Sequence, residues 1–218
     1  MPSMDQLIQW AGDTPDLPFM IADYHRLQVE HFIWSEMCGL KGQPWNRVLE
    51  AGAEQKRPYL THLGQNYLIM NVEDPANVDW VNVAPPGVCS PDVFGDIMAM
   101  PFPEKHFDFF IAAETMEHVA HPWQAMREVW RVLRPGGVAL LTTPFMWPYH
   151  GSQRYADFWR FTADGWRLLC SDFATVRVFP TEFHPESQIQ AVADIENMGK
   201  QDEVRVATGY LVKASKAL

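Results

Sequence analysis

The residue types best suited to acid–base chemistry lie in an aromatic segment at residues 144–161. Either His150 or Asp157 could take a proton from a hydroxyl or amine substrate. Arg160 in the same segment offers a cation that could position such a substrate. The alternative is that His150 and Asp157 only hold the segment together by bonding each other.

Aromatic side chains are dense in this segment. Trp147 and Tyr149 are candidates for contacting or positioning a substrate, because aromatic faces supply a large contact area. A sugar or another flat-faced molecule would suit such a wall. The rings could instead form a hydrophobic plug, and we expect core positions for Trp159, Phe161 and Trp166.

A third group of residues has side chains that bind metals. Glu117, His118 and His121 lie close together in the sequence. No further ligand stands nearby at a recognisable spacing, so the sequence predicts no metal site. We expect His118 to be a buried histidine that is bonded within the fold.

The predicted elements indicate how these residues are positioned. Short apolar runs alternate with helical patterns, which is typical of a parallel sheet covered by helices. We expect one domain over residues 1–218, with an irregular N-terminal arm at 1–22 and a lid at 144–161 over the carboxyl edge of the sheet. The predicted helices are 23–40, 56–64, 122–134 and 162–169, and the predicted strands are 47–52, 67–72, 92–95, 107–113, 138–143, 175–179 and 204–213.

Several of these strands end in small or polar residues. Ligands of open parallel sheets bind outside the carboxyl ends of the strands, and a glycine there lets the backbone approach a ligand closely. A turn at Gly52 and a cap at Asp96 are the structural alternatives. The candidates for binding a nucleotide-like cofactor are Glu50, Gly52, Ala53, Asn71, Asp96, Ile97, Ala113 and Glu114.

Length, charge and cysteine content disfavour several classes of protein. The chain has 218 residues and a formal charge of -10, which suits one α/β core and disfavours nucleic acid or anionic membranes as partners. Its three cysteines form no CxxC pair, and we find no membrane-spanning run or leader-like N-terminus. We therefore expect a cytoplasmic protein, and the N-terminal arm and the unusual tryptophan content would suit a homodimer.

The stretch from Gly95 to Pro144 carries a family resemblance. It reads GDIMAMPFPEKHFDFFIAAETMEHVAHPWQAMREVWRVLRPGGVALLTTP. This resembles the class I S-adenosylmethionine-dependent methyltransferases of the small-molecule branch, which show GD, LPF, FD, EHV and RVLKPGG in this order and spacing. The continuation PYHGSQRYADFWRFTADGW is similar to a subgroup that often occurs with surface-glycan biosynthesis.

The resemblance implies a Rossmann-like, doubly wound α/β fold whose seven-stranded sheet is mostly parallel with one antiparallel strand. It implies S-adenosylmethionine as the cofactor, with Asp96 accepting from the adenine amino group, the Ile97 amide meeting the ring, and Glu50 reaching the ammonium group through water. Two residues depart from the family pattern. Glu54 stands where a second glycine is expected, and Asn71 stands where the second strand normally ends in an acid.

Two functions stay open at this point. The matching motifs favour methyl transfer to a small molecule or a glycan precursor. Glu54 and Asn71 favour a catalytically silent binding or scaffold protein that has lost the cofactor, unless Lys56 and Arg57 offset the charge of Glu54. We expect those two cations to be an exposed pair. A nicotinamide-dependent oxidoreductase is disfavoured because the GxGxxG turn is missing.

Overall fold

The computed structural model describes residues 4–13, 24–38, 46–53, 56–72, 91–152, 155–182 and 207–218. These residues form a seven-stranded sheet with the order β3-β2-β1-β4-β5-β7-β6. Its strands are β1 (Val48–Ala51), β2 (Tyr67–Asn71), β3 (Val93–Phe94), β4 (Phe107–Ala113), β5 (Leu133–Pro144), β6 (Thr175–Thr181) and β7 (Gly209–Ser215). Strand β7 runs antiparallel to both of its neighbours, and the pairs from β3 to β5 are parallel. The predicted fold class is confirmed, with β7 as the one reversed strand.

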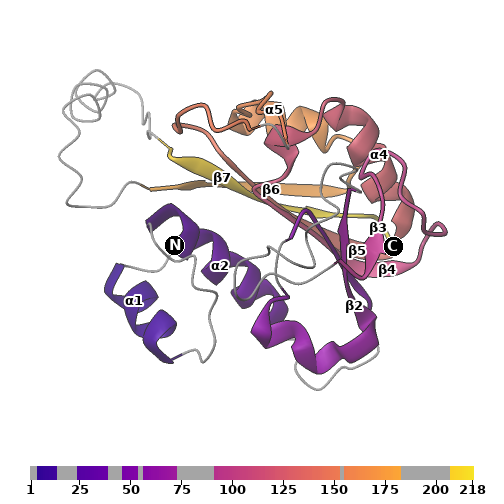
Figure 1. Ribbon diagram of the computed structural model, residues 1–218, viewed down its shortest axis with the longest axis horizontal. Coiled ribbons are helices and arrows are strands. Elements are labelled where there is room, and N and C mark those ends of the chain that lie inside the picture. Colours follow the sequence, from indigo (N-terminus) through magenta and orange to yellow (C-terminus); the bar gives the residue numbers. More distant parts are fainter. Residues whose placement is uncertain are drawn as a thin grey trace.

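Helices cover both faces of this sheet (Figure 1). The helices α1 (Met4–Asp13) and α2 (Tyr24–Met37) and the 3-10 helix η2 (Pro58–Asn66) lie on one side, and α4 (Pro122–Val132) and α5 (Ala163–Leu169) lie on the other. Successive side chains of a strand point to opposite faces. Val48 of β1 therefore packs in the cluster under α2, and Leu49 packs in the cluster under α4.

The sequence of helix α4 explains why this helix could be predicted. Pro122 occupies its first turn, where a proline costs no hydrogen bond. The apolar side chains recur every three or four residues and are buried against the sheet. The helix ends at Val132, and β5 begins at Leu133, earlier than the predicted strand. An irregular step in the β4–β5 pairing separates Leu133 from Val138, and Gly136 within it has a φ of 75°.

Two further predicted segments differ from the structure. Residues 4–13 were expected in an irregular arm but form α1, whose Leu7 is buried and whose Trp10 ring lies 5.0 Å from that of His31. The expected strand 204–213 is observed as β7 at Gly209–Ser215, and residues 204–206 lie outside the described part. No helix in the described ranges has the length and apolarity needed to span a bilayer.

Candidate functional site

The carboxyl ends of four neighbouring parallel strands lie at one edge of the sheet. The Gly95 amide donates to the Asn71 carbonyl at 2.9 Å, and the Gly52 amide donates to the Met70 carbonyl at 3.0 Å. Strand β4 pairs with β1 on the other side. The fold thus brings together the strand-end candidates Gly52, Asn71, Asp96 and Ala113.

Gly52 makes the turn that follows β1. Its φ is 80°, a conformation that residues with a Cβ rarely adopt. A Cβ on this residue would lie 2.4 Å from the Thr115 hydroxyl oxygen, which itself donates to the Ala51 carbonyl at 3.2 Å. The turn therefore requires glycine at this position for structural reasons alone. The next candidate, Ala53, is half-buried. Glu54 lies outside the described residues.

Glu50 lies within the sheet on the α2 side and is 1% exposed. Arg57 Nη2 lies 2.8 Å from its Oε1, and the Tyr67 hydroxyl donates to its Oε2. Arg57 also pairs with Glu30 of α2. Burial raises the pKa of Glu50, and the Arg57 charge opposes that rise. Both carboxylate oxygens thus have protein partners, so a cofactor contact through Glu50 stays a prediction.

The expectation of an exposed Lys56–Arg57 pair is wrong for Arg57, which is 6% exposed. The reason is that the two buried carboxylates of Glu30 and Glu50 need a cation between them. Lys56 is half-exposed and pairs with Asp92 at 2.9 Å.

The side chains of two strand-end candidates accept hydrogen bonds from backbone amides one or two residues further along the chain. Asn71 Oδ1 accepts from the Val72 amide at 3.0 Å, and Asp96 Oδ1 accepts from the Met98 amide at 2.8 Å. Asn71 and Asp96 are half-buried, and Ile97 is buried. Their expected contacts with ribose and adenine remain predictions.

Glu114 follows β4 in a left-handed conformation with a φ of 51°. Its Oε2 lies 3.1 Å from His25 Nε2, and its Oε1 accepts from the Thr142 hydroxyl at 2.7 Å. Burial would raise the pKa of Glu114, but the hydrogen bonds from His25 and Thr142 and nearby cations lower it below its ordinary value. His25 was missed by sequence reasoning, because nothing in α2 indicates that this histidine reaches across to β4.

The expected acid–base pair of the aromatic segment is brought together. Asp157 Oδ2 accepts from the His150 amide at 2.9 Å and lies 3.2 Å from its Nδ1. Arg160 Nη1 lies 2.5 Å from Asp157 Oδ1 and holds the pKa of that carboxyl well below its usual range. Arg160 also donates to the carbonyls of Trp147 and Pro148 at 3.3 and 3.2 Å. These contacts hold the segment in shape, which is the structural role that the sequence left open.

The rings of this segment divide as expected. Phe161 and Trp166 are buried, and Trp159 packs against the core while its Nε1 donates to the Val119 carbonyl at 2.8 Å. Trp147 and Tyr149 are exposed, Tyr149 by 76%. They are therefore accessible to a substrate.

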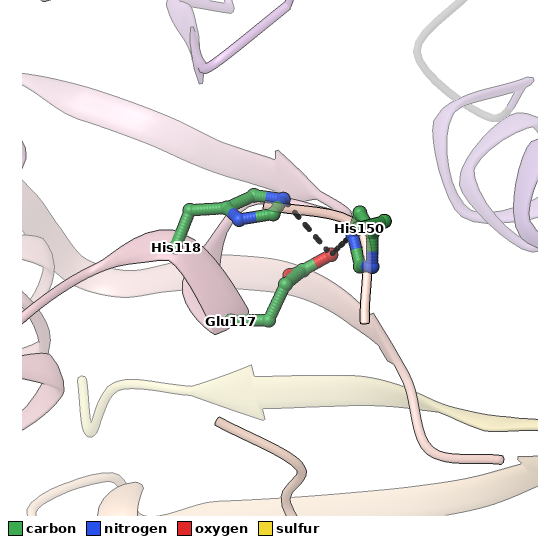
Figure 2. A group of neighbouring side chains, drawn as sticks. All are labelled: Glu117, His118 and His150. Carbon is green, nitrogen blue, oxygen red and sulfur yellow. Dashed lines mark ion pairs between the residues drawn. The ribbon is translucent and has the colours of Figure 1, made fainter. Parts of the chain in front are cut away.

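Glu117 and His118 lie on the 3-10 helix η3 (Met116–His118), directly after β4. Figure 2 shows the Glu117 carboxylate pointing between the imidazoles of His118 and His150. The amides of Phe158 and Trp159 donate to the Glu117 carbonyl at 2.8 and 3.1 Å, which fixes the aromatic segment over η3. Burial raises the pKa of the Glu117 carboxyl well above its ordinary value. The third metal-binding side chain that the local sequence lacked is thus supplied by His150.

A family model for a methyltransferase domain matches residues 51–141. This span runs from the end of β1 into β5 and includes the strand ends described above. Over these residues the chain is similar to the S-adenosylmethionine-dependent methyltransferases, and its sheet has the Rossmann-like order described above. S-adenosylmethionine is the cofactor of this family.

Curated relatives match the methyltransferase domain over part of their length. The ubiquinone/menaquinone biosynthesis C-methyltransferase UbiE of Ruegeria sp. (strain TM1040) is 34% identical over 73 residues, which cover 34% of this chain and 29% of the relative. The mitochondrial 2-methoxy-6-polyprenyl-1,4-benzoquinol methylase of Xenopus laevis is 28% identical over 139 residues, or 61% of this chain and 43% of the relative. The chain therefore matches less than half the length of these relatives.

A solved structure supports the methyltransferase fold. An S-adenosylmethionine-dependent methyltransferase from Archaeoglobus fulgidus aligns with a TM-score of 0.53 and 12% identity, covering 89% of this chain and all of that one. At this identity the likeness concerns the fold alone.

The described residues fit S-adenosylmethionine in part. The exposed Gly52 turn presents backbone without a Cβ at the end of β1, and Asp96 places a carboxylate at the end of β3. Asn71 offers a neutral amide where an acid would bind the ribose more strongly, since charged hydrogen bonds are about twice as strong as neutral ones. Gly52 and Asp96 thus fit the cofactor, and a contact of Asn71 with the ribose stays a prediction.

Proposed function

We propose that the protein transfers a methyl group from S-adenosylmethionine to a small-molecule acceptor. The observation that carries the proposal is the alignment of Gly52, Asn71, Asp96 and Ala113 along one edge of the methyltransferase sheet. Half-buried Ala113, at the end of β4, has a small side chain that leaves room at the place where family members hold the reacting methyl group.

The chain's own residues would orient the acceptor and receive its proton. S-adenosylmethionine supplies an activated methyl group when bound, so positioning of the acceptor is the main requirement. His150 Nδ1 faces the Asp157 carboxylate, which favours a proton on Nδ1 and leaves Nε2 able to accept one. The exposed rings of Trp147 and Tyr149 would contact a flat acceptor.

A quinone-like aromatic acceptor is supported by the relatives, which are named for methylation in ubiquinone or menaquinone biosynthesis and of a benzoquinol. A glycan precursor is the second acceptor class, and the segment that follows Pro144 supports it through its resemblance to glycan-associated proteins. We further propose a cytoplasmic location and a homodimer as expectations that accompany this activity.

A catalytically silent binding protein is the alternative function. The buried Glu30–Arg57–Glu50 ion pairs engage the residue expected to reach the cofactor's ammonium group. Asn71 removes the charge expected at the ribose. Both features would weaken cofactor binding without disturbing the sheet.

Calorimetric titration with S-adenosylmethionine and its demethylated product separates the two functions. We expect saturable binding of both ligands, and we expect Asp96→Ala to weaken it at least tenfold while Asp172→Ala, an exposed residue beyond α5, leaves it unchanged. Transfer of a labelled methyl group to hydroquinones would then test the acceptor class. No binding at millimolar ligand would establish the silent alternative.

A further inference from the structure

The Glu117 carboxylate has no hydrogen-bond partner within the described residues, although its side chain is 0% exposed. Both of its oxygens are buried and unpartnered. Burial of an unpaired ionised carboxylate is strongly unfavourable, so such groups are normally paired or bound to a metal. The methyl-transfer proposal gives this carboxylate no role.

Two imidazole nitrogens approach the same carboxylate oxygen. His118 Nε2 lies 3.7 Å from Glu117 Oε1, and His150 Nε2 lies 3.9 Å from it (Figure 2). These separations are too long for hydrogen bonds. The three candidate ligand atoms nevertheless lie within 4.8 Å of one another.

Hydrogen bonds at the opposite ring nitrogens leave both Nε2 atoms available as ligands. His118 Nδ1 lies 2.6 Å from the Ala156 carbonyl oxygen, which can only accept. His150 Nδ1 lies 3.2 Å from both the Pro148 carbonyl and the Asp157 carboxylate, nearer than the Arg160 guanidinium at 3.5 Å. Each neutral imidazole thus carries its proton on Nδ1 and a lone pair on Nε2.

We propose that Glu117, His118 and His150 bind a divalent first-row transition-metal ion. Two imidazoles and one carboxylate suit Zn²⁺, Mn²⁺ or Fe²⁺, whereas Mg²⁺ and Ca²⁺ prefer sets made only of oxygen atoms. Three protein ligands leave a coordination position for water or a substrate oxygen. The ion would balance the buried charge of Glu117.

The separations of the two imidazoles from Glu117 Oε1 fit a site that closes around its ion, and the three candidate ligand atoms lie within 4.8 Å of one another. Ligands at about 2.1 Å from a tetrahedral metal lie about 3.4 Å apart, a few tenths of an ångström less than the observed separations from Glu117 Oε1. Glu117 and His118 are fixed on η3, while His150 lies in a segment without regular structure. His150 Nε2 would have to move a few tenths of an ångström toward Glu117 for the ligands to reach the ion.

Asp157 would act as a positioning residue for this site. A carboxylate that bonds the far nitrogen of a ligating histidine fixes the ring and raises its basicity. Asp157 lies in this position behind His150, and Arg160 balances its charge. His118 receives the equivalent support from the Ala156 carbonyl.

Metal titration of the metal-stripped full chain tests the site without any cofactor or acceptor. We expect Zn²⁺ to bind at one site per chain in calorimetry. We also expect the electron paramagnetic resonance signal of unbound Mn²⁺ to be lost at the same stoichiometry. Glu117→Gln, which keeps the side-chain shape, should weaken Zn²⁺ binding more than about 100-fold, and Asp157→Asn should weaken it about 10- to 100-fold. His121→Ala, an exposed histidine near the cluster, should leave the affinity unchanged.

X-ray absorption of the Zn²⁺ complex should show two imidazole ligands. A spectrum with thiolate ligands, or an affinity that Glu117→Gln leaves unchanged, would mean that Glu117 is simply a protonated buried acid and would overturn the proposal. Circular dichroism of each variant controls for folding, and His118→Ala offers a second route if Glu117→Gln is unfolded. A bound ion would occupy His150 Nε2, so metal binding and the proposed proton acceptance at this atom exclude each other. Because the metal is titrated without cofactor or acceptor, loss of the proposed methyl transfer and loss of this site are separate results.

Discussion

Arg57 balances the charge of a buried group of ionisable side chains between α2 and β1. It contacts Glu30 on the helix and Glu50 on the strand, and the Tyr59 and Tyr67 hydroxyls donate to the same two carboxylates. The neighbouring carboxylates raise the pKa of Arg57 well above its ordinary value despite its burial, so it stays charged. One guanidinium therefore ties the helix to the sheet.

Replacing Arg57 with Met should destabilise the protein by about 3–5 kcal/mol, because two carboxylates would be left buried without a cation. Chemical denaturation monitored by circular dichroism measures the change. Lys56→Met is the matched control, and its half-exposed pair with Asp92 should be worth less than about 1 kcal/mol. Equal losses for the two variants would contradict this role of Arg57.

Gly52→Ala should cost about 1–3 kcal/mol of unfolding free energy, because φ is 80° and the new Cβ would contact Thr115. Gly64→Ala is a control for backbone strain alone, since its φ is 54° and no atom lies within 4 Å of the added Cβ. Thermal unfolding of both variants should show the larger loss for Gly52→Ala. A larger loss at Gly64 would mean that contact with Thr115 is unimportant.

Residue types and motifs predicted the positions of the strand-end candidates but not their partners. The pairing of His150 with Asp157 could be expected, because both lie in one short segment. The contacts of Glu50 with Arg57 and of Glu114 with His25 could not, because they depend on how α2 packs on the sheet. The approach of His150 to Glu117 likewise depends on the path of a segment without periodicity.

At the scale of elements, α5 begins with a side-chain cap. The Thr162 hydroxyl accepts from the Gly165 amide at 3.1 Å. Thr162→Ala should lower the free energy of unfolding by about 1 kcal/mol, since that amide would lose its partner. Ser171→Ala, an exposed hydroxyl beyond the same helix, should change it by less than about 0.5 kcal/mol, and urea denaturation of the two variants provides the comparison.

The elements themselves were largely predictable where the apolar pattern is regular. Strand β4 is an almost continuous apolar run, and the observed Phe107–Ala113 matches the prediction. Helix α1 was missed because the prolines on either side of it suggest a loop, although its Leu7 is buried and its Trp10 packs on Trp34 of α2. The early start of β5 was missed because Pro135 and two glycines suggest a turn rather than a strand.

At the scale of the whole molecule, chemical modification of the Cys170 thiol would detect unfolding of the core. It is buried beside the α4 side of the sheet, and burial raises the pKa of its thiol to about 12. At pH 8 we expect iodoacetamide to modify the exposed Cys38 within minutes and to modify Cys170 only when the domain unfolds, as peptide mapping by mass spectrometry would show. Rapid modification of Cys170 in native buffer would contradict this packing.

The place of β7 between β5 and β6 has a consequence for synthesis on the ribosome. Residues 209–215 must emerge before β5 and β6 gain the partner that joins them, since β7 pairs with both strands along its length. Until then the nascent chain exposes one edge of β5 and leaves β6 without its neighbour, a condition that favours association with other chains. Among the described strands, β7 is thus the one that joins β5 to β6, and slow translation of this region would lengthen the time during which a chaperone is needed.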